Sequence, residues 1–556
     1  MHRRIPFFLQ AGLRVALVLP AALAAAPAWS IASSTAAPVP EAAASKAPAP
    51  SNAPLTQEQQ AVHVLNRLAF GPRPGDVERV ERMGVARWID EQLHPESIPL
   101  PPALTERLEA LDSVNRGAGA ALGEFLELRK EARNEGPEAK EQRRRRQAQV
   151  TRQEAEARLL RAIDSPRQLE EVMVDFWYNH FNVFAGKDID RALVASYERD
   201  AIRPYALGSF RDLLGATATH PAMLVYLDNA QSSARGVNEN YARELMELHT
   251  LGVEGGYSQQ DVTELARMLT GWTFERKRLV ERGETFRFDA RRHDAGSKTW
   301  LGQQIAPDGQ REGEHALDVL AMHPTTARHV SRQLAQYFVS DDPPQALVER
   351  MARTWRATGG DIRSVLRTLF SSAEFMAAGS AGAKFKTPYQ FVVSAARAGA
   401  VPVRNVEPLL GALNGLGMPL YGCQTPDGYK NTQEAWLNPD ALARRIGFAA
   451  ALANGKLGLD KAPAAVPLVP LVPPAAPNAA RAMAPAAANP GGSDAVDMAA
   501  PAAPMPMPAA PVALDPAQLQ ATLAGAISPH TLDIAGRSPA NLRAAMLLGS
   551  PDFMQR

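Results

Sequence analysis

Two histidines lie where the packing of apolar side chains does not explain a polar residue. In residues 169–184 the apolar side chains recur with helical spacing, and His180 falls in the middle of the face that they form. In residues 238–252 His249 falls within a second apolar arc. A buried polar group without a partner costs about 1–3 kcal/mol. Each histidine therefore needs either a hydrogen-bond partner in the core or a metal ion.

The helix predicted over residues 238–252 also carries a polar stripe. Asn240, Glu244 and Glu247 share this stripe. Glu244 and His249 point about 140° apart on a regular helix, so they are not neighbours on one face. A shared site requires that both meet a third element, or that the helix loosens near its end. The alternative is an ion pair between Glu244 and an arginine.

A third candidate is the pair His293–Asp294, which precedes a glycine in a predicted loop, where both side chains can point one way. Imidazole and carboxylate groups suit a divalent transition metal such as zinc, iron or manganese. In this hypothesis His180, His249 and His293 are metal ligands, Asp294 is a ligand or orients one, and Glu244 is a ligand or the catalytic base. Metal–nitrogen bonds of about 2.0–2.1 Å predict ring nitrogens within about 4–5 Å of one another or of a common point.

Helices must position these residues, because strand-like alternation is nearly absent. The sequence predicts an all-α, multi-helix globular domain over residues 55–456, with at most a small β-hairpin. Two short segments, 286–289 and 299–301, alternate like strands and are predicted to pair as that hairpin. The charged segment 124–163 is predicted to form a solvated helical hairpin.

Two further segments bear on the site and on the domain. Residues 415–436 are rich in Gly, Pro and aromatic side chains, which predicts a loop that lines a pocket or peptide groove, or a rigid loop that covers the core. Residues 544–554 repeat the pattern of residues 365–376. We therefore expect helices in residues 516–556 to rejoin the helical domain.

Ala- and Pro-rich composition marks two segments in which apolar burial is too small to offset chain entropy. Residues 29–54 are predicted to be a disordered linker, and residues 462–513 a disordered insertion.

The N-terminus predicts export. Residues 1–28 have the plan of a signal peptide, with three arginines, an apolar run from Val15 to Ala26, and small residues at the end. The apolar run is shorter than the roughly 20 residues that span a bilayer. We therefore expect cleavage, a mature chain without a transmembrane anchor, and a periplasmic or secreted location.

Charge argues against nucleic acid as a partner. The chain of 556 residues has 60 basic and 59 acidic side chains, so it offers no field that attracts phosphates. Cys423 is the only cysteine, which excludes an intramolecular disulfide and a cysteine-based metal centre.

Several long motifs resemble one bacterial family, the domain-of-unknown-function 1800 family. The motifs are Phe176–Phe181, Asn238–Leu245, Glu247–Gly252, Gly271–Thr273, His293–Asp294 and Lys384–Pro388. The resemblance runs from about residue 57 to residue 455 and resumes near the C-terminus. It implies an exported helical protein, often encoded near a second family of secreted proteins, and it supplies no activity. It also implies that His180, Glu244, His249, His293 and Asp294 belong to recurrent motifs.

Two functions are therefore expected. The first is a binding or assembly role in the envelope, with a secreted protein encoded nearby as the partner. The alternative is a metal-dependent periplasmic enzyme, hydrolytic or oxidative, that uses the cluster of His, Asp and Glu side chains.

Overall fold

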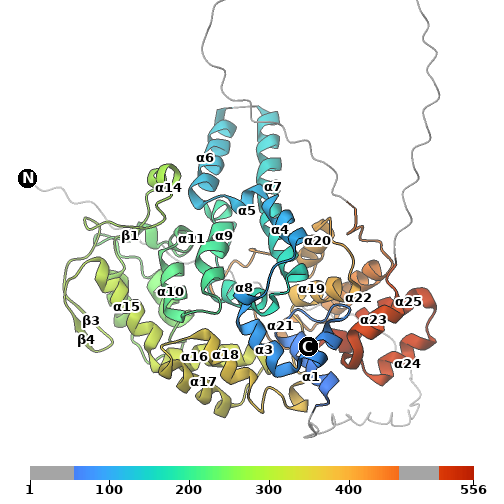
Figure 1. The fold of residues 1–556 in the computed structure, drawn as a ribbon. Helices are drawn as coiled ribbons and strands as arrows, with labels where there is room; N and C mark the ends of the chain where they lie inside the picture. The colour runs from blue at the N-terminus through green and yellow to red at the C-terminus, as the bar shows by residue number, and fades with distance from the viewer. Residues whose placement is uncertain (1–54, 135, 462–512) are drawn as a thin grey trace, which may run out of the picture. The chain divides into compact units, whose positions relative to one another are not determined.

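The computed structural model describes residues 55–134, 136–461 and 513–556, and helices dominate these residues (Figure 1). The all-α fold predicted from sequence is confirmed. The predicted signal peptide (1–28), linker (29–54) and almost all of the insertion (462–513) lie outside the described residues.

Helices as far as residue 247 supply the centre of the core and much of the site. They are α1 (Gln57–Arg67), α2 (Asp76–Met83), α3 (Val85–Leu93), α4 (Pro102–Glu109), α5 (Asp112–Asn115), α6 (Ala118–Asn134), α7 (Pro137–Asp164), α8 (Gln168–His180), α9 (Val194–Ser196), α10 (Phe210–Thr219), α11 (Pro221–Tyr226) and α12 (Asn240–Glu247). A π-helix, η3 (Tyr197–Ile202), and the short 3-10 helices η1 (Pro95–Ser97), η2 (Asp190–Ala192), η4 (Arg203–Tyr205) and η5 (Asn229–Gln231) connect them.

Helices after residue 247 complete the domain. They are α13 (Gln259–Met268), α14 (Arg276–Arg282), α15 (Gln310–Met322), α16 (Pro324–Phe338), α17 (Gln345–Ala357), α18 (Ile362–Phe370), α19 (Pro388–Gly399), α20 (Glu407–Gly415), α21 (Gln433–Trp436), α22 (Pro439–Ala453), α23 (Pro516–Leu523), α24 (Pro529–Arg537), α25 (Ala540–Leu548) and α26 (Pro551–Met554), with 3-10 helices η6 (Ala378–Ser380) and η7 (Ala524–Ala526).

The core is centred on α8 and α19, in which nearly every side chain is buried. A helix that is buried all round must be covered by others, since no face remains for solvent. α3 and α7 pack on α8, and α7, α20, α22 and α23 pack on α19. α8 ends at His180, earlier than the helical spacing through residue 184 indicated. The end of this central helix therefore holds the first candidate histidine.

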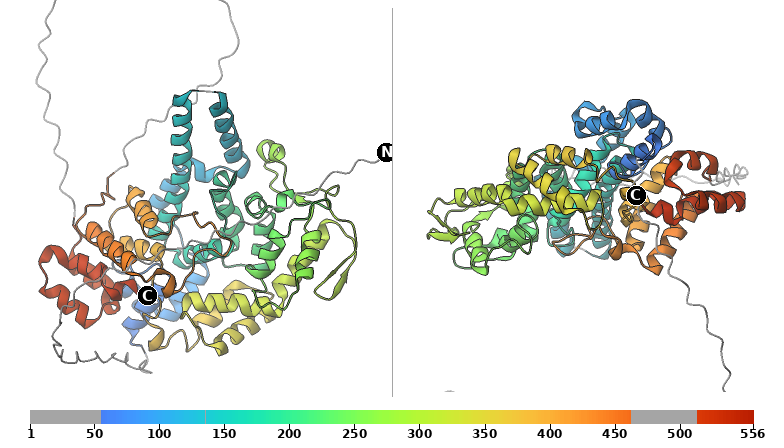
Figure 2. Two further views of the ribbon diagram at one scale, coloured as in Figure 1. Left: turned by 180° about the vertical axis from the view of Figure 1, so that it is seen from behind. Right: turned by 90° about the horizontal axis from the view of Figure 1, so that it is seen from below.

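α6 and α7 form the predicted helical hairpin and run side by side away from the rest of the helices (Figure 1 and the left panel of Figure 2). The hairpin surrounds a cavity of only about 30 Å³, lined among others by Phe125 and Val150. A cavity of this size holds no more than a water molecule or two.

The predicted pairing of residues 286–289 with 299–301 is wrong. β1 (Trp272–Thr273) pairs with β2 (Arg287–Phe288), and β3 (Lys298–Trp300) pairs with β4 (Gln303–Ile305), as two separate antiparallel pairs. Leu301 and Gly302 both have positive φ, at 47° and 74°, as a tight two-residue hairpin turn requires. This turn pairs β3 with β4, the next strand along the chain, and β2 pairs with β1 instead.

The C-terminal residues expected to rejoin the domain pack against helices from both halves of the chain. α25 packs on α22, α23 packs on α19, and η7 packs on α1. The segment α23–α25 lies beside α22 in every view (Figures 1 and 2). Gln555 also forms an antiparallel bridge with Phe385. None of the described helices has the length and apolar character needed to cross a bilayer.

Candidate functional site

The structure brings His180 and His249 together, through the backbone. The rings are 6.0 Å apart between centroids, and Nε2 of His180 donates a hydrogen bond to the main-chain oxygen of His249 at 3.1 Å. His249 lies beyond the end of α12, where its N–H donates to the oxygen of Glu244, five residues back. The helix therefore loosens before Gly252. This loosening was one of the two conditions given above for a site shared by Glu244 and His249.

Helix α16 adds a third histidine that the sequence motifs did not indicate. Burial and the nearby His329 lower the pKa of His180 to about 3, and burial and His180 hold the pKa of His249 well below its usual value. A Cβ at Gly252 would lie 2.7 Å from Nδ1 of His329, so this glycine permits the approach of α16. At neutral pH the three imidazoles are packed as neutral groups.

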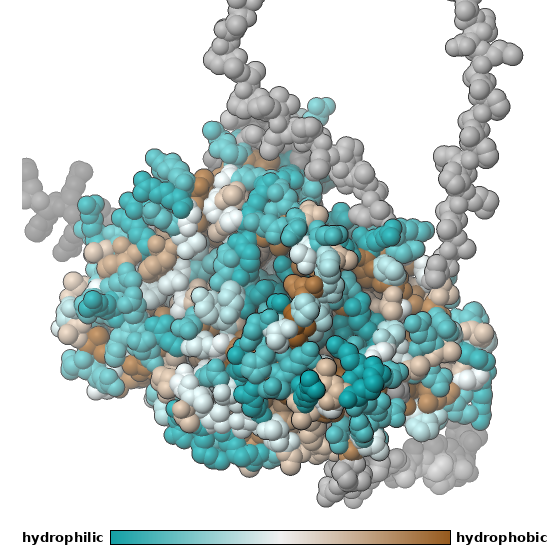
Figure 3. Space-filling model, viewed as in Figure 1, coloured by the Kyte–Doolittle hydropathy of each residue, from teal (hydrophilic) through white to brown (hydrophobic). Residues whose placement is uncertain are grey.

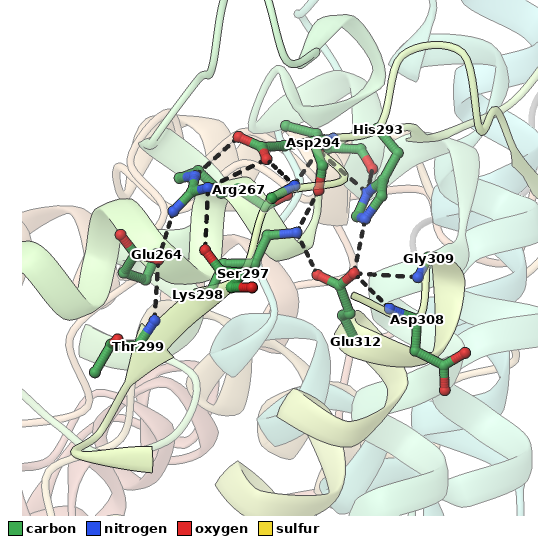
Figure 4. A network of polar contacts seen from close by, with 12 residues as sticks. Glu264, Arg267, His293, Asp294, Ser297, Lys298, Thr299, Asp308, Gly309 and Glu312 are labelled. Carbon is green, nitrogen blue, oxygen red and sulfur yellow. Dashed lines mark hydrogen bonds and ion pairs between the residues drawn. The ribbon is translucent and has the colours of Figure 1, made fainter. Parts of the chain in front are cut away.

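His293 makes its hydrogen bonds with a different set of residues, in the polar network that Figure 4 shows. Its Nδ1 lies 2.9 Å from the main-chain oxygen of Thr270, and its Nε2 lies 3.0 Å from a carboxylate oxygen of Glu312. The second Glu312 oxygen forms an ion pair with Lys298 at 2.6 Å, and neither of these two side chains is exposed. Burial alone would raise the pKa of Glu312, but the hydrogen bonds from Lys298 and His293 outweigh it and lower that pKa.

Asp294 is held in the same network by Arg267, whose Nε donates to its carboxylate at 2.8 Å (Figure 4). The hydrogen bond from Arg267 lowers the pKa of Asp294, which keeps this carboxylate ionised. The network ties the loop before β3 to α13 and α15. It holds the loop in place and engages both ring nitrogens of His293 and the carboxylate of Asp294.

The predicted convergence of His180, His249 and His293 on one metal ion is therefore not found. His180 is bonded to a backbone oxygen, and His293 is engaged by Thr270 and Glu312. Within the described residues no three or more His, Cys, Asp and Glu side chains are grouped so that they could hold a metal. Separate partners on separate elements accept hydrogen bonds from the rings of His180 and His293. The buried Nε2 of His249 has no hydrogen-bond partner among the described residues.

Glu244 lies on the polar stripe predicted for α12, and its side chain is half-buried. Burial, and after it the like charges of Glu247 and Asp427, raise the pKa of Glu244. Among the described residues no hydrogen bond or ion pair reaches the carboxylate of Glu244 or Glu247. Among the predicted site residues, Glu244 is therefore the one whose half-buried side chain can bind a ligand from solvent.

A pocket of about 440 Å³, open to solvent, lies on the same side of α12. Asn240 lines it one helical turn before Glu244, and the other lining residues are Phe184, Lys187, Tyr226, Leu227, Gln424 and Pro426. Nζ of Lys187 forms an ion pair with Asp228 at 2.8 Å, so its charge is neutralised at the wall. The pocket walls come from the segment after α8, from the end of α11, from the start of α12 and from the loop 415–436.

Two asparagines near the end of α8 fix that loop, and the sequence analysis did not single them out. Asn179 exchanges hydrogen bonds of 2.8 Å with the backbone N–H and oxygen of Tyr429. Asn182 donates to the main-chain oxygens of Cys423 and Thr425 at 3.0 and 2.8 Å. The loop therefore lines the pocket in a fixed position, as one of the two predictions for it required.

Buried charge anchors the loop at its other end. Tyr421, at a left-handed φ of 55°, donates from its hydroxyl to Glu198 at 2.9 Å. Arg158 lies 3.1 Å from Glu198 and 5.4 Å from the centre of the Tyr421 ring. The strained backbone at Tyr421 is thus held by an ion pair and a cation–π contact.

Comparison with known protein families gives a match over most of the chain. The family described as "Protein of unknown function (DUF1800)" matches residues 63–555. The chain belongs to this family. Searches of curated proteins and of solved structures found no match.

The motifs of this DUF1800 protein have distinct places in the structure. The motif Phe176–Phe181 contributes Asn179 to the pocket loop and His180 to the histidine group. The motif at residues 238–252 contributes Asn240 and Glu244 to the pocket side of α12 and His249 to the core. Asn179 lies so close to Gly428 that a Cβ at this glycine would be 2.3 Å from the main-chain oxygen of Asn179. A glycine in this loop was therefore the sequence signal for a close neighbour.

Proposed function

We propose that this DUF1800 protein is exported and acts as a binding protein for a secreted partner encoded nearby. It holds a cationic side chain of that partner in the pocket lined by Asn240, next to Glu244. The observation that carries the proposal is the half-buried carboxylate of Glu244, which has no hydrogen-bond partner among the described residues and lies beside an open pocket of about 440 Å³.

The size and lining of the pocket suit one inserted group. Ligand pockets have volumes of about 300–1,000 Å³ and combine apolar walls with a few polar groups that orient the ligand. Phe184, Leu227 and Pro426 supply apolar wall here, and Asn240 and Gln424 supply polar groups.

The charges near the pocket favour a cation. Glu244 and Glu247 share one stripe of α12. Asp427 follows Pro426 in the pocket loop, where Lys430 forms an ion pair with it at 2.6 Å. The mutual repulsion of these three carboxylates contributes to the raised pKa of Glu244. A bound guanidinium or ammonium group relieves that repulsion and donates hydrogen bonds to the carboxylate of Glu244, which receives none from the described residues.

The surface supports recognition by a pocket rather than by a broad apolar patch. On the face drawn in Figure 3 hydrophilic residues predominate, and hydrophobic residues occur in small scattered groups. Partners that are recognised mainly by apolar contact need a contiguous apolar area. A polar pocket with an anchoring carboxylate provides specificity without one.

Titration with a fluorescent arginine-rich peptide tests the proposal. The wild-type protein should bind this peptide and not a glutamate-rich peptide of equal length. Glu244→Gln should weaken binding at least about tenfold, because a charge-assisted hydrogen bond contributes about 1.5–3 kcal/mol. Glu254→Gln, the same change at an exposed residue, is the control. Equal loss in both variants, or no binding by the wild type, would contradict the proposal.

Photo-cross-linking identifies the partner itself. A cross-linking residue at Asn240 should capture the secreted protein encoded nearby, and the same residue at Glu254 should not. Capture of the secreted protein from both positions would show that it contacts this surface without binding specifically in the pocket, which would contradict the proposal.

A second candidate function is acid–base catalysis by Glu244, which its raised pKa favours. No three-ligand set is present in the described residues, so this candidate does not rest on a metal. Hydrolysis of nitrophenyl esters or glycosides that is lost in Glu244→Gln and kept in Glu254→Gln would favour it over binding alone.

A further inference from the structure

A second polar group in the core consists almost entirely of cations. We define the cation cluster as five side chains from residues that are at most 5% exposed: Arg67, Lys384, Lys386, Arg445 and Arg556. Two of these residues belong to the motif Lys384–Pro388, to which neither the fold nor the pocket assigned a role. None of them lines the pocket near Glu244.

Backbone contacts bring the cluster together from four parts of the chain. Lys384 and Arg556 exchange main-chain hydrogen bonds, and the N–H of Lys386 donates to the oxygen of Met554 at 2.8 Å. Arg445, on α22, reaches this ladder and donates from Nη2 to the oxygen of Lys386 at 2.8 Å. Arg67 approaches from α1 and donates to the oxygen of Ser380.

Aromatic rings cover part of the charge. Nζ of Lys386 lies 3.9 Å from the centre of the Phe553 ring. The guanidinium carbon of Arg445 lies 4.5 Å from the centre of the Phe385 ring. Cation–π contacts stabilise a buried cation but leave its N–H groups without acceptors.

Five nitrogen atoms of the cluster have no hydrogen-bond acceptor among the described residues. They are Nε and Nη1 of Arg67, Nε and Nη1 of Arg445, and Nε of Arg556. Buried guanidinium groups in proteins are normally satisfied, because each unmet donor has lost its bonds to water. Three separate arginines share this deficiency, and the described residues do not supply the acceptors that they need.

The charge balance leads to the same requirement. Asp341, paired with Lys384, is the only side-chain carboxylate that forms an ion pair with the cluster in the described part of the chain. Four of the five positive charges then remain without an ion-pair partner among the described residues. Burial, together with Arg556 and Arg445, holds the pKa of Lys386 well below its usual value, so this lysine can lose its charge. The arginines keep theirs.

We propose that the cation cluster is a binding site for one small inorganic oxyanion, phosphate or sulfate. A tetrahedral oxyanion accepts hydrogen bonds on every side, and arginine is the side chain best matched to it. The burial of all five residues excludes a ligand with an attached chain, which would need a path to solvent. The site therefore takes the free ion and joins α1, α22 and the C-terminal residues.

Equilibrium dialysis of the full mature chain against radiolabelled phosphate, in phosphate-free buffer, tests the site. We expect saturable binding of one ion per chain, with competition by unlabelled sulfate. Arg445→Met should weaken binding at least about tenfold, since it removes charge-assisted hydrogen bonds. Arg444→Met is the matched control, because Arg444 neighbours Arg445 on α22 but its side chain is 54% exposed.

Selenate provides a readout that does not depend on a variant. Its selenium scatters X-rays anomalously, so crystals of the wild-type protein grown with selenate should show one peak among the three arginines. A peak only elsewhere would overturn the proposal. So would the absence of saturable phosphate and sulfate binding, or an equal loss of binding in Arg444→Met and Arg445→Met.

Discussion

Nε2 of His180 donates a hydrogen bond to the main-chain oxygen of His249, at 3.1 Å. This contact joins the end of α8 to the segment after α12. It uses a ring N–H that a neutral imidazole possesses, so it needs no positive charge in the core. The two histidines are thus packed as neutral groups, and protonation opposes the folded state.

Stability should therefore fall as the pH falls from about 6.5 towards 3. The pKa of His180 is about 3 in the folded protein and about 6.5 in the unfolded chain, so in this window only the unfolded chain binds the proton. Between pH 7 and pH 5 this histidine alone removes about 2 kcal/mol from the free energy of unfolding. Urea unfolding at both pH values should show a smaller difference for His180→Gln. The exposed His315, changed in the same way, should leave the difference unchanged.

Removal of the carboxylate of Glu312 should destabilise the protein strongly. In Glu312→Gln the buried ammonium of Lys298 loses its ion-pair partner, and breaking a buried pair costs about 3–5 kcal/mol. Glu281→Gln removes one partner of the exposed pair with Lys277 and should cost at most about 1 kcal/mol. Chemical denaturation measures the loss of unfolding free energy in each variant. Similar losses in the two variants would show that the network of Figure 4 contributes no more than a surface pair.

Gly428→Ala should disturb the pocket loop. Gly428 has a φ of 68°, where a side chain costs about 1–3 kcal/mol, and its new Cβ would lie 2.3 Å from the Asn179 oxygen. We expect lower stability together with weaker binding of the arginine-rich peptide. Gly411→Ala, inside α20 with open space at the Cβ position, should instead stabilise the protein by about 0.5–1 kcal/mol. If Gly428→Ala bound the arginine-rich peptide with unchanged affinity, the position of the loop would not contribute to peptide binding in the pocket.

Cleavage of residues 1–28 should release a mature chain that begins near Trp29. The expected observation is an N-terminal peptide from this position in the periplasmic or extracellular fraction, identified by mass spectrometry. Full-length protein with Met1 in the cytoplasm would contradict the predicted signal peptide.

The sequence by itself determined the helices and their faces. The helical hairpin predicted over residues 124–163 is observed as α6 and α7, which cover Ala118–Asn134 and Pro137–Asp164. The polar stripe of Glu244 was also predictable. These features depend on periodicity within one element, where each side chain's direction follows from its position in the helix.

Tertiary structure alone decided the partners. His293 meets Glu312, nineteen residues away, and His180 meets the backbone of His249, sixty-nine residues away. The two segments predicted to form a hairpin have other partners, because the tight turn at Leu301 and Gly302 pairs β3 with β4, the strand that follows it directly. A buried polar group is satisfied by whichever acceptor the packed elements bring within about 3 Å. Spacing along the chain sets the direction of a side chain, but only the packing of elements distant in sequence sets what it meets.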